Sequence, residues 1–380
     1  MKQPEISVIV PVYNTGQYLA RCLDSLVAES EPKTEIICVD NGSTDESAKI
    51  LAAYAARYPN IKVVSLPENL GAGAARNRGL ENASGKYIRF CDSDDWIEPG
   101  ALGKSDDWYL PGSNRILYEA LKKQKVDVVC AHNAFAYEDE SDKETNESRI
   151  DREYYNPARK GRFSLDENIN VNVMLWNKIF KKSLIDKYAL RFPEHYRHDD
   201  DVFWFYYHSV ANDIFFLEDE VYAYYIRRNS IMHEMINEKK HLARNPASAK
   251  SFTDVTYVVL DFLQKHNLLK DNLDRFYGFA SRQFALYMLH GDNLAEEIKK
   301  FNRKMKSVGI KKYIVCDDDI KGLYRINGNS SVMVCRIKAW LYRLAYYFSF
   351  GSAGKKFHQK AKEYLRAAKM LRNSSQLKDL

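Results

Sequence analysis

The chain has 380 residues, 45% of them hydrophobic, so it is long enough to bury a large core and to form two or three structural units. It contains no run of about 18 apolar residues, which argues against a membrane-spanning helix. Its six scattered cysteines form no Cys-x-x-Cys pair, which argues against a zinc site or a disulfide framework. The chain enters an apolar segment at once, without a basic region or a cleavage site, so we expect a cytoplasmic protein.

The net charge of +6 is unevenly distributed, because residues 336–380 hold eleven Lys and Arg against two acidic residues. Residues 336–350 combine aromatic and basic side chains at helical spacing, which is typical of a helix on an anionic membrane surface. Such a helix would attach the protein to the inner face of the cell membrane. A helix that packs on the rest of the protein is the alternative. We do not expect nucleic acid as a partner.

Residues 1 to about 130 alternate between short apolar strands and amphipathic helices. The predicted strands are 6–10, 35–39, 61–65, 86–90 and 126–131, and the predicted helices are 15–27, 47–58, 72–83 and 115–123. Short strands connected by helices indicate an α/β fold with a Rossmann-like, mostly parallel sheet, which binds ligands at the carboxyl ends of its strands.

The later part of the chain changes character. We expect a polar insertion at about 103–114 and a mobile, highly charged loop at about 138–155. Beyond about 240 the pattern is mainly helical without sustained heptads. The predicted organisation is therefore one domain over 1–238, followed by a helical region over 239–380 that ends in the basic tail.

Three carboxylates follow the predicted strand 86–90, namely Asp92, Asp94 and Asp95. Carboxylates at this spacing repel one another, so a nearby cation would stabilise them. Oxygen ligands suit Mg²⁺ or Mn²⁺, which often carry substrate phosphates. A polar turn that caps the next helix is the alternative. The similar run 106–108 lies in the predicted insertion, and we interpret it as unrelated.

Three further motifs precede these aspartates: Ser-Val-Ile-Val-Pro-Val-Tyr-Asn at 7–14, Ile-Cys-Val-Asp-Asn-Gly-Ser-Thr-Asp at 37–45 and Asn-Leu-Gly-Ala-Gly-Ala-Ala-Arg-Asn at 69–77. In this order they resemble the family-two inverting glycosyltransferases of bacterial surface-polysaccharide synthesis. The resemblance is dense over 5–100 and resumes at 176–180, 198–203 and 222–230. It implies an A-type glycosyltransferase fold that binds a nucleotide-sugar across the sheet.

The nucleotide-sugar site is predicted at the ends of the first strands. Pro11 is expected to end its strand, so that Val12 and Tyr13 offer backbone groups to a base or ribose. Asp40 can accept the imide N–H of uracil, and an Asx turn with Asn41 is the alternative.

Further donor contacts are expected from the third motif and beyond. Gly71 and Gly73 would let the loop backbone pass close to a ligand, and Arg76 would reach the base or diphosphate unless it is an ordinary exposed helix arginine. The complete predicted donor-binding set is Pro11, Val12, Tyr13, Asp40, Asn69, Gly73, Arg76, Asp92, Ser93 and Arg227.

The metal and its ligands are taken from the resemblance. It assigns Asp92 to the ribose and metal shell and Asp94 to direct coordination of Mn²⁺ or Mg²⁺, whose charge would stabilise the departing diphosphate. His233 is a candidate for completing the shell, with an ordinary surface histidine as the alternative. Asp95 either caps the next helix or braces the site.

The resemblance also places the catalytic base within 198–203. Aligning Phe203 with the aromatic residue of the family assigns the base to Asp200. Asp199 stands where the family usually has Glu, so the register among 199–201 stays open. Three adjacent aspartates would raise at least one pKa, which suits a proton acceptor. A solvated acidic helix start is the alternative.

Acceptor contacts are predicted at Trp176, Lys178 and Asp199. Trp176 either stacks on a sugar face or belongs to the core. Residues 225–230 match a family segment that closes over the diphosphate, with Arg227 or Arg228 pairing with phosphate.

Together these features predict a metal-dependent, inverting hexosyl- or N-acetylhexosaminyltransferase. It would move a sugar from a UDP-sugar to a hydroxyl of a glycan or lipid-linked glycan. A sugar nucleotidyltransferase is one alternative, although no Lys-bearing, Gly-rich phosphate loop follows the first strand. A catalytically inactive glycan- or membrane-binding scaffold is the other.

Overall fold

The computed structural model describes residues 3–29, 33–97, 112–137, 159–165, 171–196, 198–226, 246–290, 294–310, 314–316 and 324–326. The chain divides into two compact units. The first consists mainly of residues 1–228, and the second mainly of 229–261 and 269–380. The predicted boundary at 238, the charged loop at 138–155 and the basic tail lie outside the described residues.

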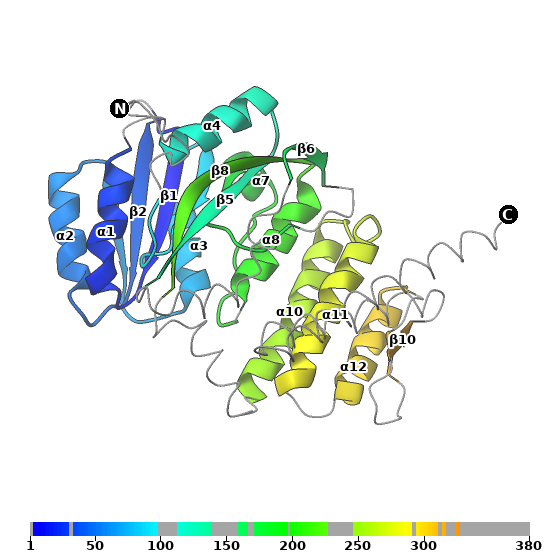
Figure 1. The fold of residues 1–380 in the computed structure, drawn as a ribbon. Coiled ribbons are helices and arrows are strands. Elements are labelled where there is room, and N and C mark those ends of the chain that lie inside the picture. Colours follow the sequence, from blue (N-terminus) through cyan, green and yellow to red (C-terminus); the bar gives the residue numbers. More distant parts are fainter. Residues whose placement is uncertain are drawn as a thin grey trace, which may run out of the picture. The chain divides into compact units, whose positions relative to one another are not determined.

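Within the described residues, the first unit contains an eight-stranded sheet in the order β3-β2-β1-β4-β7-β5-β8-β6 (Figure 1). The first four strands in this order are parallel. Their bounds are β1 (Ile6–Val12), β2 (Thr34–Asn41), β3 (Ile61–Leu66) and β4 (Tyr87–Phe90). Because they are parallel, their carboxyl ends lie along one edge of the sheet.

The other half of the sheet is mixed. β7 (Lys178–Lys181) runs antiparallel between β4 and β5 (Val128–Tyr137). β5 is parallel to the long strand β8 (Asp213–Ile226), and β6 (Gly161–Ser164) is antiparallel to β8. The predicted mostly parallel α/β sheet is confirmed, although the sequence did not predict β6, β7 or β8.

The helices follow the apolar patterns of the sequence. In α1 the buried residues Leu19, Cys22, Leu23 and Leu26 form one face at spacings of three and four. α3 packs against β1 and β2. These two strands are almost entirely buried, which accounts for their continuous apolar sequences, because a parallel strand covered on both faces has no solvent side. The helices of this unit are α1 (Gly16–Val27), α2 (Ser47–Arg57), α3 (Ala72–Asn82), α4 (Ser113–Gln124), α7 (Lys182–Lys187) and α8 (Asp199–Val210).

Two predicted boundaries are wrong. Pro11 does not end the first strand, because β1 continues to Val12 with Pro11 opposite Val39. β4 pairs with β1 only as far as Ile9, so Pro11 lies beyond the doubly flanked part of the strand, where a missing N–H is tolerated.

The second concerns the end of the insertion predicted at about 103–114, of which residues 103–111 lie outside the described part of the chain. Ser113 and Asn114 are buried and begin α4. The carboxylate of Glu29, at the end of α1, accepts the Asn114 backbone N–H at 2.7 Å. It thereby satisfies one of the amides that every helix start leaves without an intrahelical partner.

The second unit contains the helices α10 (Pro246–Lys265), α11 (Leu273–His290) and α12 (Leu294–Ser307). Phe301 of α12 is fully buried and contacts the rings of Phe276 and Phe284 from α11. Two short antiparallel strands, β9 (Ile314–Cys316) and β10 (Tyr324–Ile326), also belong to it, and the sequence did not predict them. No helix in the described part of the chain is both long and apolar enough to cross a membrane.

Candidate active site

The loops that follow β1 and β2 are tied together at the carboxyl edge of the sheet. Asn14 has φ of 51°, and its Oδ1 accepts the Thr44 backbone N–H at 2.8 Å. The Asn14 backbone N–H donates to Ser43 Oγ at 3.2 Å. These contacts fix the position of Tyr13, a residue that is 43% exposed. An exposed aromatic ring at a strand end can stack on a nucleobase.

Asp40 lies beside this loop and is buried. Its Oδ1 accepts the Ser43 backbone N–H at 2.9 Å, so the Asx-type turn considered from the sequence is present. The turn does not exclude nucleobase binding, because a carboxylate has a second oxygen that can accept another hydrogen bond. Val12 is fully buried, which leaves Tyr13 as the accessible residue of the pair.

Asn41 is a site residue that the sequence analysis did not select. Its Nδ2 donates to Asn69 Oδ1 at 2.9 Å and to Gly71 O at 3.1 Å, and its Oδ1 accepts the Leu70 N–H at 3.0 Å. Gly71 has φ of +92° and precedes α3. Asn41 therefore holds the loop of the third motif against the end of β2. Its place in the second motif, directly after Asp40, was the available signal.

Gly73 differs from its predicted role. A Cβ atom there would lie 3.0 Å from Pro193 O and 3.1 Å from Asp199 Oδ2. The close approach that this glycine permits is therefore to the protein segment before α8. A direct role for Gly73 in donor binding has no support in these contacts.

The aspartate loop is braced by the end of β8. Asp95 is fully buried, and its Oδ2 accepts the Tyr222 hydroxyl proton at 2.7 Å while its Oδ1 accepts the Tyr225 N–H at 2.7 Å. The Asp92 N–H donates to the same Tyr222 hydroxyl oxygen at 3.1 Å. Of the two roles considered for Asp95, bracing the site is the one that these contacts support.

Other contacts fix the rest of this loop. The buried Ser93 accepts a hydrogen bond from Thr15 Oγ1 at 2.9 Å, so its hydroxyl already holds the loop to the start of α1. Arg21 donates to Asp94 O at 3.2 Å, and its guanidinium lies 4.0 Å from the Trp96 ring centre and 4.2 Å from that of Tyr225. The Asp94 backbone is thus held by a cation between two aromatic rings.

Arg76 connects the two acidic parts of the site. Its Nη2 donates to Asp92 Oδ1 at 3.0 Å and its Nη1 to Asp199 Oδ2 at 2.9 Å, and the side chain is mostly buried. Burial acts to lower the pKa of Arg76, but the charges of Asp199, Asp92 and Asp200 raise it above its ordinary value. The alternative of an ordinary exposed helix arginine is therefore wrong. One guanidinium joins the aspartate loop to the start of α8.

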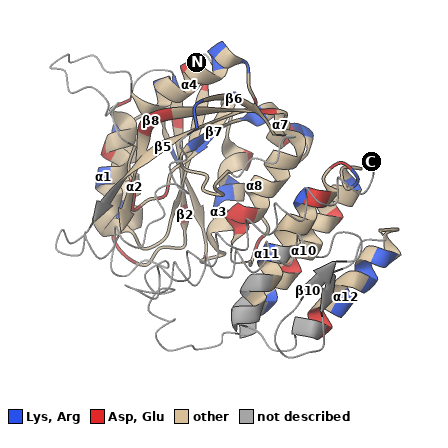
Figure 2. Ribbon diagram, turned by 45° about the vertical axis from the view of Figure 1, so that its right-hand side comes forward, with Lys and Arg blue, Asp and Glu red and all other residues tan. Residues whose placement is uncertain are grey.

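The predicted base lies in the first turn of α8, whose acidic residues are coloured red in Figure 2. Asp200 Oδ1 accepts the Asp201 N–H at 2.9 Å. Burial, followed by the charges of Asp201 and Asp199, raises the pKa of Asp200 to about 7, while Arg76 acts in the opposite direction. The alternative of a solvated acidic turn does not fit this environment. His198, which precedes the turn, has φ of 62°, a conformation that is uncommon for a residue with a side chain.

The aspartate loop is the candidate metal site. Among the described residues, no group of three His, Cys, Asp or Glu side chains is arranged to hold an ion. His233 and Arg227 lie outside the described residues. Asp92 and Asp94 nevertheless fit Mg²⁺ or Mn²⁺, which commonly bind one or two carboxylates and take the remaining ligands from water and substrate phosphates. Burial and the charges of Asp94 and Asp92 raise the pKa of Asp95, so added positive charge would stabilise this loop.

The acceptor-wall prediction for Trp176 and Lys178 is wrong. Trp176 is 5% exposed, and its ring stacks on those of Tyr222 at 4.6 Å and Tyr224 at 5.5 Å between ring centres. It is a core residue, which was the alternative. Lys178 is fully buried, and its Nζ donates to Asn172 Oδ1 at 2.7 Å, to Asn177 Oδ1 at 3.0 Å and to the Met174 carbonyl. Burial lowers its pKa to about 8.

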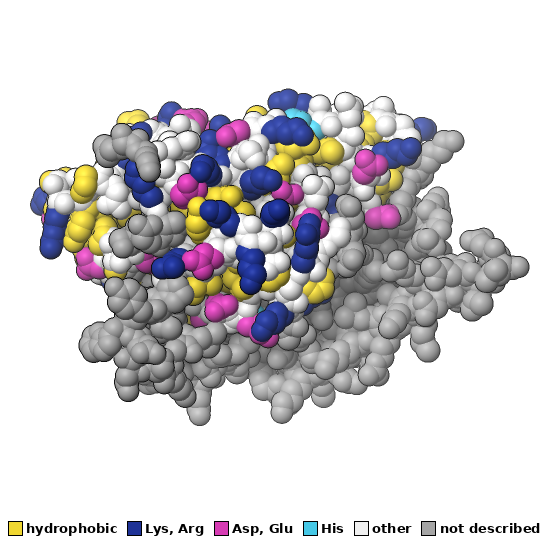
Figure 3. Space-filling model, turned by 90° about the horizontal axis from the view of Figure 1, so that it is seen from above, with side chains coloured by type: hydrophobic (Ala, Val, Ile, Leu, Met, Phe, Trp, Pro, Cys, Tyr) yellow, Lys and Arg dark blue, Asp and Glu magenta, His cyan; other side chains and the backbone are white. Residues whose placement is uncertain are grey.

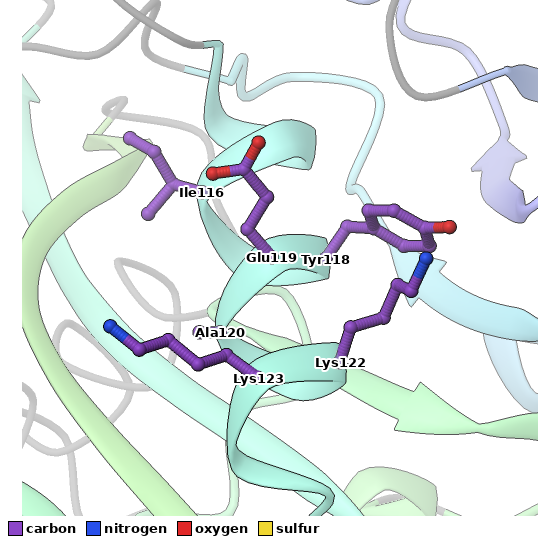
Figure 4. Close-up of a pocket in the computed structure, with 6 residues that line it drawn as sticks. All are labelled: Ile116, Tyr118, Glu119, Ala120, Lys122 and Lys123. Carbon is purple, nitrogen blue, oxygen red and sulfur yellow. The ribbon is translucent and has the colours of Figure 1, made fainter.

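The opposite edge of the sheet has a different character. A shallow hollow beside α4 is lined by Ile116, Tyr118, Glu119, Ala120, Lys122 and Lys123 (Figure 4). α4 leads into the amino end of β5, away from the aspartates. Figure 3 looks onto this side and shows basic side chains interspersed with acidic ones. Ion pairs such as Lys86–Glu5 and Arg115–Glu119 indicate an ordinary solvated surface.

Comparisons with known proteins agree with this geometry. A family model described as "Glycosyl transferase family 2" matches residues 7–104. The putative glycosyltransferase EpsH of Bacillus subtilis (strain 168) is 30% identical over 325 residues, which cover 84% of this chain and 85% of the relative. The glycosyltransferase GlyG of Streptococcus pneumoniae is 29% identical over 277 residues, covering 70% and 87%. A poly(ribitol-phosphate) beta-glucosyltransferase of Bacillus spizizenii is 32% identical over 229 residues, covering 59% and 33%.

Solved structures show the same fold. S. aureus TarS 1–349, crystallised in complex with UDP-GlcNAc, aligns with a TM-score of 0.55 and 19% identity over 98% of this chain and 92% of that chain. At this identity the likeness concerns the fold, and it confirms the predicted A-type architecture.

Proposed function

This chain belongs to glycosyl transferase family 2, and we propose that it transfers a sugar from a UDP-sugar to a hydroxyl group of a glycan. Membership of the family makes it a glycosyltransferase, and the nucleotidyltransferase alternative is set aside. The observation that carries the finer proposal is the ion-paired unit of Asp92, Arg76 and Asp199. It brings the candidate donor carboxylates and the candidate base to the same edge of the sheet.

The donor would lie along the carboxyl ends of β1, β2 and β4. Tyr13 offers an exposed ring for the base, and Asp40 offers a carboxylate oxygen for the imide N–H. A uracil base is supported by the crystallisation of a neighbour of the same fold with UDP-GlcNAc. Arg76, which pairs with Asp92 at 3.0 Å, would add positive charge beside the diphosphate.

Departure of UDP places negative charge on the diphosphate. A divalent cation held by Asp92 and Asp94 would neutralise that charge when bound. The protein prepares the site for this, because Asp95 and Tyr222 fix the loop and Arg21 holds the Asp94 backbone. A rigid loop keeps the two carboxylates at a constant separation from the donor.

Asp200 would remove the proton from the acceptor hydroxyl, whose oxygen then attacks the anomeric carbon on the face opposite UDP. The single displacement inverts the configuration and forms no covalent sugar–protein intermediate. A pKa of about 7 suits this role, because the carboxylate is then both available and basic near neutral pH. Asp199, paired with Arg76, would hold the neighbouring position rather than take the proton.

The acceptor is proposed to be a bacterial surface glycan or its lipid-linked precursor, built at the inner face of the membrane. The support is the poly(ribitol-phosphate) beta-glucosyltransferase among the relatives. Attachment of the basic tail to an anionic membrane stays a prediction, because the tail lies outside the described residues.

The proposal is tested by measuring UDP release from a panel of UDP-sugars with Mn²⁺ and glycan acceptors. We expect turnover by the wild-type protein and a loss of about 100-fold or more in Asp94→Asn and in Asp200→Asn. Both variants should keep the wild-type melting temperature within a few degrees. Undiminished turnover in a variant would remove the role given to that residue, and no turnover with any UDP-sugar would refute the proposal and favour an inactive scaffold.

A further inference from the structure

Asn77 ends the third sequence motif, and no part of the proposed function uses it. We propose that Asn77 is a positioning residue: it holds the segment 192–194 against α3 and thereby places the carboxylate of Asp200 for proton removal. This inference rests on the proposed function, since it requires Asp200 to act as the base.

Asn77 is 6% exposed, and its side-chain amide makes three hydrogen bonds to the segment 192–194. Its Nδ2 donates to Phe192 O at 2.9 Å and to Glu194 Oε1 at 3.1 Å, and its Oδ1 accepts the Phe192 N–H at 2.8 Å. Phe192 lies outside any helix or strand. The side-chain amide of Asn77 therefore satisfies both the N–H and the C=O of Phe192, as a neighbouring strand would in a sheet.

Phe192 in turn contacts both sides of the site. Its ring stacks face to face on Phe203 of α8, with 4.2 Å between ring centres and an interplanar angle of 4°. It meets the ring of Phe90, the last residue of β4, edge-on at 5.4 Å. Phe203 lies about one turn after Asp200, and Phe90 lies two residues before Asp92. A shift of Phe192 would therefore alter the placement of the base relative to the donor carboxylates.

Neighbouring positions of α3 show why Asn77 is well placed for this role. Gly73, Arg76 and Asn77 are spaced by three and four residues, so they share one face of the helix. The missing side chain of Gly73 admits Pro193 O and Asp199 Oδ2, and Arg76 pairs with Asp199. This face of α3 therefore contacts residues 192–194 and the first residue of α8, and the same helix follows the Asn69–Gly71 loop of the proposed donor site.

The test is Asn77→Asp, which keeps the size and the acceptor atoms, removes the N–H donor and adds a charge beside Glu194. We expect kcat to fall by roughly 10- to 100-fold through misplacement of the base. The Kd for UDP with Mn²⁺ and the KM for the donor should change by less than about twofold, because the donor contacts lie elsewhere. The matched control is Asn82→Asp on the same helix, whose amide donates to Arg78 O; it should keep the wild-type kcat.

Gly73→Ala provides a second variant in case Asn77→Asp folds poorly. Alanine favours the helix, but its methyl group would displace Pro193 and Asp199, so kcat should again fall with UDP binding and melting temperature retained. Unchanged kcat in a folded variant, or a loss of UDP binding in step with kcat, would overturn the inference. If the wild-type protein itself transferred no sugar, the proposed function would fail first and this role for Asn77 with it.

Discussion

At the scale of single residues, the protonation of Asp200 is set by its surroundings. Burial and the charges of Asp201 and Asp199 raise its pKa to about 7, and Arg76 opposes them. The charge of Asp200 in turn acts to raise the pKa of Lys178, which burial lowers. A base must be deprotonated to act. We therefore expect kcat/KM to rise with pH and to level off above an apparent pKa near 7, which belongs to the coupled carboxylates together.

Asp201→Asn tests this origin of the pKa. It removes a negative charge that disfavours ionisation of Asp200, so the midpoint of the pH–kcat/KM curve should move to lower pH. Asp186→Asn is a suitable control, because Asp186 is exposed and pairs with Lys182 on α7; its curve should match the wild type. If the midpoint moved upward or stayed in place in Asp201→Asn, the rise of kcat/KM with pH could not be assigned to Asp200.

At the scale of elements, the two aromatic residues that the sequence suggested as ligand contacts have different roles. Trp176 precedes β7 and stacks on two tyrosines of β8, whereas Tyr13 is exposed after β1. Trp176→Ala should lower the free energy of unfolding by about 3–5 kcal/mol, because it leaves a cavity in the core. Tyr13→Ala should leave the stability nearly unchanged and weaken UDP binding. Denaturant titration and calorimetry measure both effects, and a stable Trp176→Ala that loses only acceptor affinity would restore the sugar-stacking hypothesis.

The length and apolar pattern of each element explain which elements the sequence predicts. The strands from Ile6 to Phe90 are short, apolar and separated by helices with regular periodicity, so local pattern was sufficient. β7 and β8 were missed because their pairing is long-range and their residues depart from simple patterns. β7 contains the fully buried Lys178, and β8 extends over fourteen residues that include several acidic ones.

The candidate site was predicted to a similar extent. The aspartates of the loop and of α8 lie in recognisable motifs, and the position of the loop after a parallel strand predicted the sheet edge on which it lies. The pairing of Arg76 with Asp199 joins residues 123 positions apart, and no local pattern encodes it. The side chains of Trp176 and Lys178 are buried because tyrosine rings and side-chain amides pack around them, and a motif comparison does not reveal these contacts.

At the scale of the whole molecule, the candidate site residues that the structure describes lie within the first unit, at the carboxyl edge of one sheet. The loops after β1 and β2 form one side, the aspartate loop braced by β8 lies after β4, and α3 connects both to the start of α8 (Figure 1). Under the proposed function, this arrangement would place the donor site and the proton acceptor on different segments of the chain, with α3 contacting both. The central claim is that a UDP-sugar occupies this edge with its diphosphate at Asp92 and Asp94.

The most direct test is a crystal structure of the protein soaked with UDP and Mn²⁺. The account predicts uracil beside Tyr13 and Asp40, and manganese within about 2.0–2.4 Å of an oxygen of Asp92 or Asp94. It also predicts that both phosphate groups of UDP lie on the side of Arg76 that faces the metal. UDP bound at any other place, or manganese bound away from both carboxylates, would contradict it.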